Sequence, residues 1–468
     1  MTHTHVELRP GAYADSVALL QVSRAVQQAD GVVAAQVAMA TALNLEVLEG
    51  MGFDVPAEAG PNDLVVAVRL DDADTLDAAL AAVADALDRA GRRAEGGAAD
   101  LAPHRTTATA LRDAPGGLVL VSVPGRHALV EAMDALEAGS DVMVFSDNVP
   151  VAHEVALKRA AADRGLLVMG PDCGTAVVDG VGLGFANVVR PGPVGLVAAS
   201  GTGCQQLLAL LDHAGVGVSS ALGVGGRDLA AEVGGPSTTE ALRRLDADPD
   251  VELVVLVSKP PAPEVAATVG SYAEGLATPV ELALLGPGRP DLTAAAEAVL
   301  RRLGRAVPPW PVTGTAAPAS RGRLLRGLFV GGTLCQEARI LAEEALGADA
   351  GHTFVDFGDD AWTEGRAHPM IDPTLRLEHL ARAAADPETA VLLLDVVLGH
   401  GAEPDPAALL APALADLDLP VVVSLVGTAA DPQDLAAQTA ALAGAGAEVH
   451  LSNAGAARRA VELVGSRG

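Results

Sequence analysis

Cysteine is scarce in this sequence. Three cysteines, Cys173, Cys204 and Cys335, lie far apart among the 468 residues, and any disulfide scheme leaves one of them unpaired. That usage is typical of a reducing compartment. The sequence also lacks an apolar signal core near its start and an apolar run long enough to cross a bilayer. We therefore expect a soluble, cytoplasmic protein without a membrane partner.

Positive charge is scarce as well. Lysine and arginine number 31 against 60 aspartates and glutamates, so the formal net charge is −29. A field of that sign repels phosphate backbones and argues against a nucleic-acid partner. The sequence contains no G-x-x-x-x-G-K-[ST] loop, so the usual nucleotide-binding loop is excluded. Half of the residues are hydrophobic, which provides for a sizeable core.

One stretch occurs twice. Residues 194–211 and 326–346 each read as an apolar strand, a glycine-rich turn and a helix with apolar residues at helical spacing. The similarity continues downstream, where the turn 225–228 is matched by 358–360. The repeat is too long for a solenoid and predicts two duplicated α/β domains, at about 190–310 and 325–468.

Both glycine-rich turns are candidate anion sites. A helix N-terminus offers free backbone N–H groups and the positive end of the helix dipole, and nearby hydroxyls add donors. A turn that merely packs tightly is the alternative interpretation. The residues predicted to bind substrate or phosphate there are Ser200, Gly201, Thr202, Gly203, Gly331, Gly332 and Thr333. Further members of the predicted set, in turns after strands, are Gly226, Arg227, Lys259, Asp359 and Asp360.

The first part of the chain reads as separate modules. Residues 1–92 show a strand–helix–strand–helix–strand–helix order, with Asp15 or Ser16 as the first N-cap, and we interpret them as a small regulatory or interfacial α/β module. Residues 91–117 read as a linker. Residues 115–189 alternate strands and helices as in a parallel sheet, without a G-x-G-x-x-G turn. Ligands of such sheets bind at the strand ends.

The densest polar stretch is 355–376. It is broken by glycine and proline, and long loops of this kind are commonly functional. Arg366 and Arg376 could grip a carboxylate or phosphate, and His368 could transfer a proton near neutral pH. We take Arg366 and His368 as the catalytic candidates. A solvated loop with ion pairs is the alternative, and no metal site is expected.

The cysteines have two interpretations. Cys204 and Cys335 lie one turn inside the two helices, where the dipole could lower a thiol pKa, although a role as small buried residues is favoured. Cys173 lies in a turn that looks exposed and is a candidate ligand contact. Asp172 and Asn187 are the other possible ligand contacts.

Several motifs carry a resemblance to known families. The turn 170–173, the turn 196–202 and the glycines of 223–226 resemble the α subunit of succinyl-CoA synthetase. Nearly the full length is similar to FdrA proteins through GPDCGT, FAN, ASGTG, GVGGRDL, SKPP, FVGGTLC, DFGDD and HPMIDPTLR. The resemblance implies an α/β fold with a Rossmann-like domain of the CoA-binding type at 115–189. Two flavodoxin-like, succinyl-CoA synthetase-like domains would follow the small N-terminal module.

The resemblance also implies a function. FdrA proteins are associated with purine and allantoin breakdown, as one subunit of an oxamate carbamoyltransferase that interconverts oxalurate and phosphate with oxamate and carbamoyl phosphate. Carbamoyl phosphate and oxamate-type molecules would be the ligands, other carbamoyltransferase subunits the partners, and a homo-oligomer is also possible. No cofactor is certain; CoA is possible, but we expect it to bind weakly or not at all.

One departure from the synthetases leaves alternatives open. Their phosphorylated histidine should follow the SKPP motif, yet no histidine lies between His213 and His352, and the ATP-grasp domain is absent. The leading interpretation is a carbamoyltransferase subunit. The alternatives are an acyl-CoA ligase subunit whose partner supplies ATP-grasp, and an inert scaffold. We expect the turns 200–203 and 331–334 to lie near a shared cleft.

Overall fold

The computed structural model describes residues 3–12, 14–95, 104–319, 321–363 and 366–465. The chain divides into two compact units, each of which combines two stretches of sequence. The first comprises Met1–Pro103 and Asp359–Asp372. The second comprises His104–Gly358 and Pro373–Gly468. The loop that holds Arg366 and His368 therefore belongs to the first unit, although its neighbours in sequence belong to the second.

The first unit is a small α/β module. Its sheet is antiparallel, in the order β1-β3-β2. Asp15 caps the first helix by accepting a hydrogen bond from Ala18 N, as one of the two predicted N-caps. The elements are β1 (His3–Arg9), α1 (Ser16–Gln27), β2 (Val32–Met39), α2 (Ala42–Gly50), β3 (Leu64–Leu70), the 3-10 turn η1 (Ala73–Thr75), α3 (Leu76–Glu95) and, from the later stretch, α12 (Asp360–Thr363).

The second unit begins with a three-stranded parallel sheet in the order β4-β5-β6. Its strands are short and apolar, and the helices between them give the crossovers that parallel pairing requires. The elements are α4 (Thr107–Asp113), β4 (Val119–Val121), α5 (Gly125–Glu137), β5 (Val142–Val144), α6 (Val151–Ala162) and β6 (Val168–Met169).

A six-stranded sheet follows, in the order β12-β11-β9-β10-β7-β8. The hairpin of β7 and β8 pairs with β10, so these residues extend this sheet and not the preceding one. The central strands are buried on both faces, which explains their continuous apolar sequence. The elements are β7 (Thr175–Val178), β8 (Val181–Gly184), β9 (Val194–Ala199), α7 (Gly201–His213), β10 (Val218–Gly223), α8 (Pro236–Asp246), β11 (Leu253–Ser258), α9 (Pro263–Glu274), β12 (Val280–Leu284) and α10 (Leu292–Arg302).

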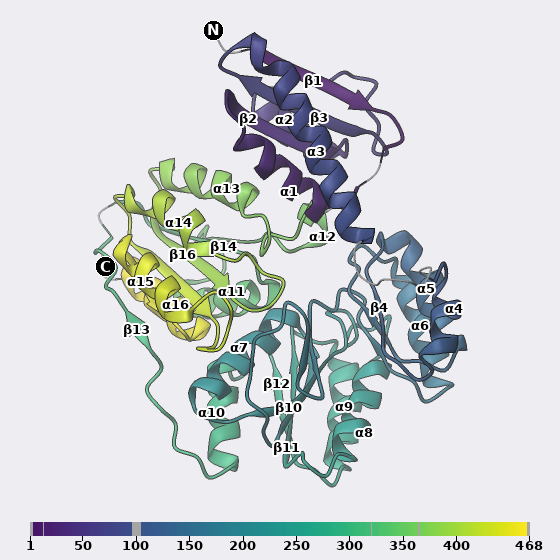
Figure 1. The fold of residues 1–468 in the computed structure, drawn as a ribbon. Coiled ribbons are helices and arrows are strands. Elements are labelled where there is room, and N and C mark those ends of the chain that lie inside the picture. The colour runs from purple at the N-terminus through teal and green to yellow at the C-terminus, as the bar shows by residue number, and fades with distance from the viewer. Residues whose placement is uncertain (1–2, 13, 96–103, 320, 364–365, 466–468) are drawn as a thin grey trace. The chain divides into compact units, whose positions relative to one another are not determined.

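The C-terminal sheet repeats this plan and is drawn in green to yellow in Figure 1. Its order is β13-β18-β17-β16-β14-β15, and only the pairing of β13 is antiparallel. The predicted α/β class, with parallel sheets and a small N-terminal module, is confirmed. The elements are β13 (Val312–Thr313), β14 (Leu324–Phe329), α11 (Gly332–Leu346), β15 (Thr353–Asp356), α13 (Thr374–Ala385), β16 (Thr389–Val397), α14 (Pro406–Ala415), β17 (Val421–Val426), α15 (Leu435–Gly444), β18 (Ala447–His450) and α16 (Asn453–Gly465).

Candidate functional site

Both glycine-rich turns lie at the switch point of their own sheet. Strand β9 has β10 on one side and β11 on the other, so the winding of the sheet reverses at β9. Strand β14 lies in the same way between β15 and β16. In open α/β sheets, ligands bind outside the carboxyl ends of the strands at this point. The turns after β9 and β14 are therefore the places where each sheet would hold a ligand.

The two turns meet. Ser200 Oγ and Thr333 Oγ1 lie 2.6 Å apart, and both residues are buried. A Cβ at Gly331 would lie 2.8 Å from Thr202 Oγ1, and one at Gly203 would lie 3.0 Å from Thr333 Cγ2. A larger residue at either position would need these side chains to move, because the two turns pack so closely. The two duplicated turns lie next to each other, as predicted, and the shared cleft stays a prediction.

The facing helix ends differ in how they are capped. Ser200 is the N-cap of α7 and accepts a hydrogen bond from Gly203 N at 2.9 Å. Gly331 is the N-cap of α11 and has no side chain that could bond the first turn. Helix α11 therefore has more unsatisfied N–H groups to offer at its positive end than α7. The two dipoles converge on the same small region.

A lysine and an aspartate flank the start of α11. A Cβ at Gly332 would lie 2.3 Å from Asp356 Oδ2 and 2.7 Å from Lys259 Nζ. Lys259 directly follows β11, and Asp356 is the last residue of β15. Lys259 belonged to the predicted set. Asp356 did not, although its place at the carboxyl end of a strand beside the second turn was a usable signal.

A buried ion pair holds the second turn from behind. Asp395 accepts hydrogen bonds from Val330 N at 2.8 Å and Gly331 N at 2.9 Å, and Arg376 Nη1 lies 3.1 Å from its Oδ1. Burial raises the pKa of Asp395 to about 6, against the opposing effect of Arg376. Arg376 is 4% exposed and also donates to the Asp395 carbonyl. Arg376 was expected to grip a ligand, and in the structure its Nη1 bonds Asp395 instead.

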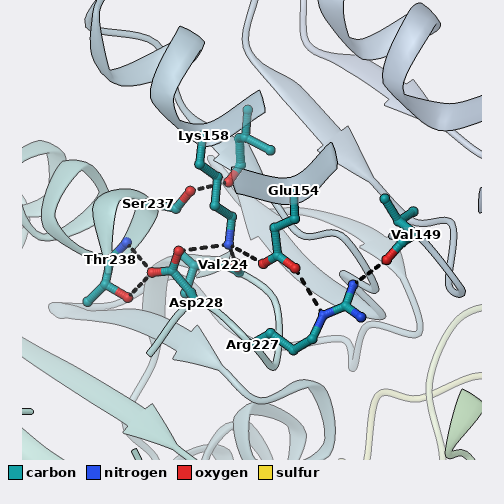
Figure 2. Close-up of polar contacts among 9 residues, drawn as sticks. Val149, Glu154, Lys158, Val224, Arg227, Asp228, Ser237 and Thr238 are labelled. Carbon is teal, nitrogen blue, oxygen red and sulfur yellow. Dashed lines mark hydrogen bonds and ion pairs between the residues drawn. The ribbon is translucent and has the colours of Figure 1, made fainter. Parts of the chain in front are cut away.

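The turn after β10 is fixed by the buried cluster in Figure 2, which joins it to α6. Lys158 Nζ donates to Glu154 Oε1 at 2.8 Å, to the Val224 carbonyl at 2.9 Å and to Asp228 Oδ1 at 2.7 Å. Arg227 Nε donates to Glu154 Oε2 at 2.9 Å. The three N–H groups of the ammonium are thus all used within the protein. Arg227, a predicted phosphate ligand, serves here to pair with Glu154, and Gly226 beside it is exposed.

Two of the three possible ligand contacts are buried. Asn187 Nδ2 donates to the Leu398 carbonyl at 3.0 Å and to Asp431 Oδ2 at 2.8 Å, so Asn187 joins the duplicated domains. Cys173 is 2% exposed and not in an exposed turn. Tertiary packing covers both of these side chains. Asp172 is exposed and has a φ of 55°, a left-handed conformation that is uncommon outside glycine.

The thiols are not activated. Burial raises the pKa of the Cys204 thiol to about 12, and burial also raises the pKa values of Cys173 and Cys335. Desolvation of the thiolate outweighs the helix dipole at both helix positions. The favoured interpretation of Cys204 and Cys335 as small buried residues is confirmed.

Within the first unit, the loop candidates bond to their own segment. Arg366 Nη2 lies 3.9 Å from Asp372 Oδ2, and Asp359 Oδ1 accepts from Ala361 N at 3.0 Å. His368 Nδ1 accepts a hydrogen bond from Met370 N, and burial lowers the pKa of His368 to about 4. The imidazole is therefore neutral at physiological pH. The expected titration of His368 near neutrality is wrong because the ring is desolvated. Asp360 begins the short helix α12.

Two further properties concern the described residues as a whole. They contain no group of three or more histidine, cysteine, aspartate or glutamate side chains placed to hold a metal ion. Their helices include none that combines the length and the apolar character needed to span a bilayer.

Comparison with protein families gives two matches. Residues 1–103 match the family described as AllF, heavy metal-associated domain. Residues 328–463 match the family described as CoA-ligase, and this range begins just before the second turn and includes Thr333 and Asp356. The C-terminal domain is thus similar to the CoA-ligase family over this range.

Individual proteins extend these matches. The α 2 subunit of the ADP-forming succinate–CoA ligase of Archaeoglobus fulgidus is 28% identical over 248 residues, which cover 52% of this chain and 75% of the relative. Among solved structures, ATP citrate lyase from Methanothrix soehngenii matches 44% of this chain and 38% of its own, at 16% identity and a TM-score of 0.35. The protein YahF of Escherichia coli K12 is 37% identical over 442 residues, which cover 86% of this chain and 85% of the relative. The chain therefore belongs to the family of YahF.

Proposed function

We propose that this protein is a subunit of an acyl-CoA ligase-type enzyme. We further propose that the turns 200–203 and 331–334, called the paired turns below, hold an acyl phosphate. The observation that carries the proposal is the contact between Ser200 and Thr333, which brings two helix N-termini to one place. Two helix ends with one lysine make a region that favours an anion. The matches to CoA-ligase and to succinate–CoA ligase α subunits support this reaction class.

The placement of Lys259 supports an anionic ligand. A cation near a helix N-terminus is unfavourable, because the dipole is positive there. An anion bound between the helix ends and the ammonium would remove that repulsion. Asp356 offsets part of the positive charge, and Asp395 with Arg376 forms a separate buried pair behind the turn.

CoA is the second ligand that this reaction class implies. The ends of β5 and β6 fit its approach, because Asn148 and Asp172 both hold left-handed backbone there, with φ values of 52° and 55°. Strain of this kind is commonly retained at ligand sites. Arg126 at the start of α5 could meet a phosphate of the nucleotide end. CoA would supply the thiol that accepts the acyl group.

The test is acetyl phosphate binding by calorimetry. We expect Lys259→Ala to weaken binding by roughly tenfold or more, since charge-assisted contacts contribute about 1.5 to 3 kcal/mol. Arg305→Ala is the matched control, since it removes one positive charge from an exposed position after α10. If both variants and the native protein bind acetyl phosphate with equal affinity, the paired turns are not the anion site.

Carbamoyl transfer is the second candidate. Carbamoyl phosphate is itself an acyl-type phosphate, so the same turns could hold it. The absence of any histidine between His213 and His352 in the sequence favours a reaction without a phosphohistidine at that point. Oxamate would present a carboxylate to the same positive region. Phosphate-dependent cleavage of oxalurate by the protein with its genomic neighbours would favour this candidate over the ligase.

A further inference from the structure

We propose that Asp356 accepts a phosphoryl group from the bound acyl phosphate, so that the protein forms an aspartyl phosphate. The proposal rests on the proposed function, because it needs an acyl phosphate at the paired turns. It adds a covalent step and assigns it to one carboxylate.

The carboxylate of Asp356 is aimed at the candidate site. Its Oδ1 accepts a hydrogen bond from Gly358 N at 2.9 Å, which orients the group. Its Oδ2 lies 2.3 Å from the position that a Cβ of Gly332 would take. Asp356 is only partly buried, so a ligand can reach it. Carboxylates are established nucleophiles toward phosphorus in enzymes.

The surroundings suit the transfer. Lys259 Nζ lies 2.7 Å from the same Cβ position, so ammonium and carboxylate flank one residue at the start of α11. The charge on the transferring phosphoryl oxygens is spread out, and fixed positive groups stabilise it. Lys259 and the first N–H groups of α11 are such groups. They also offset the repulsion between the Asp356 carboxylate and the incoming anion.

The step balances without another reactant. An oxygen of Asp356 attacks phosphorus, and a new P–O bond forms. The bond from phosphorus to the acyl oxygen breaks, and its electron pair leaves with the acyl carboxylate. No proton moves and nothing is oxidised or reduced. One acyl phosphate replaces another, so the energy of the anhydride is retained in the protein.

The experiment uses the full chain and radiolabelled acetyl phosphate with magnesium chloride. We expect up to one phosphoryl group per chain, lost in alkali and in hydroxylamine, as acyl phosphates are. Borohydride reduction followed by mass spectrometry should convert the residue at position 356 to homoserine. Asp356→Asn should lose the label. Asp349→Asn, an exposed aspartate in the loop between α11 and β15, should keep it.

Binding is measured beside labelling to separate the two proposals. If acetyl phosphate raises the Tm of the native protein but leaves it unlabelled, the covalent step is overturned and the proposed function stands. If the anion neither stabilises nor labels the protein, both are overturned. A label that survives in Asp356→Asn, or one stable in alkali and lost in acid as in a phosphohistidine, also overturns the assignment to Asp356. Stabilisation of Asp356→Asn without label supports it.

Discussion

Ser200 Oγ and Thr333 Oγ1 lie 2.6 Å apart, although 133 residues separate them in the chain. Ser200 is the N-cap of α7 and Thr333 is the second residue of α11, so each hydroxyl lies where a helix begins at the switch point of its own sheet. The duplicated domains therefore face each other through the turns that the duplication copied. Neither turn alone makes the site, because the second helix end and Lys259 come from different domains.

This contact should contribute to stability unequally from its two sides. Ser200→Ala removes both the interdomain hydrogen bond and the N-cap of α7, whereas Thr333→Ala removes only the former. We expect a loss of about 2 kcal/mol for Ser200→Ala and about 1 kcal/mol for Thr333→Ala, measured by urea unfolding. Thr268→Ala on the exposed face of α9 is the control and should change little. A larger loss at Thr333 than at Ser200 would contradict the capping role.

Gly332→Ala should remove anion binding. Its new methyl group would lie within 3 Å of both the Asp356 carboxylate and Lys259 Nζ, so at least one charged group must move. We expect acetyl phosphate affinity to fall at least as far as in Lys259→Ala. The control is Gly444→Ala in α15, where a Cβ meets no atom within 4 Å. Unchanged affinity in a folded Gly332→Ala protein would place the anion elsewhere.

The sequence predicted what local patterns determine. The spacing of apolar residues and the glycines determine the strand, the turn and the helix. The predicted strand, turn and helix were correct for both copies of the repeat. The N-cap at Asp15 is likewise local. Burial is not local: Arg376 and Asn187 look like ligand groups in the sequence, but residues distant along the chain enclose them.

Asp356 shows the same limit from the other side. The sequence places it at a strand end, which is a usable signal, but spacing alone does not favour it over the nearby Asp359. What distinguishes it is the approach of Lys259, which comes from the other duplicated domain. No spacing rule connects two residues whose proximity depends on how two sheets face each other.

Glu337 should make stability depend on pH. It is buried in α11, where Leu292 N and Asn453 Nδ2 donate to its carboxylate, and burial raises its pKa to about 7. The folded state therefore binds this proton more tightly than the unfolded state. Its contribution to the free energy of unfolding is full below pH 4.5 and is lost as pH rises to about 7.

Glu337→Gln tests this contribution. The native protein should lose about 1 to 3 kcal/mol of stability from this group across that window, and the variant should lack this loss. The measurement is urea unfolding at a series of pH values from 4.5 to 8. Glu343→Gln, on the exposed part of the same helix, is the control and should retain the native slope. Identical slopes for all three proteins would show that Glu337 stays ionised throughout.

CoA affinity separates the two candidate functions. A ligase-type subunit must bring the CoA thiol to the acyl phosphate, so the proposed function replaces the weak binding expected from the sequence with micromolar binding, measured by calorimetry. The proposed place of binding is the strand ends of the sheet β4-β5-β6, where Asn148 and Asp172 have left-handed conformations.

Arg126→Ala should weaken the CoA affinity by about tenfold if that guanidinium contacts a CoA phosphate. If the lost contact is to the 3′-phosphate, 3′-dephospho-CoA, which lacks that phosphate, should bind the native protein and Arg126→Ala with similar affinity. Arg159→Ala is the control, because it removes a positive charge from the last turn of α6, whereas Arg126 lies at the start of α5. If the native protein binds acetyl phosphate but not CoA, the paired turns remain the proposed anion site. Carbamoyl transfer is then favoured over the ligase reaction, because it needs the anion and not the thiol.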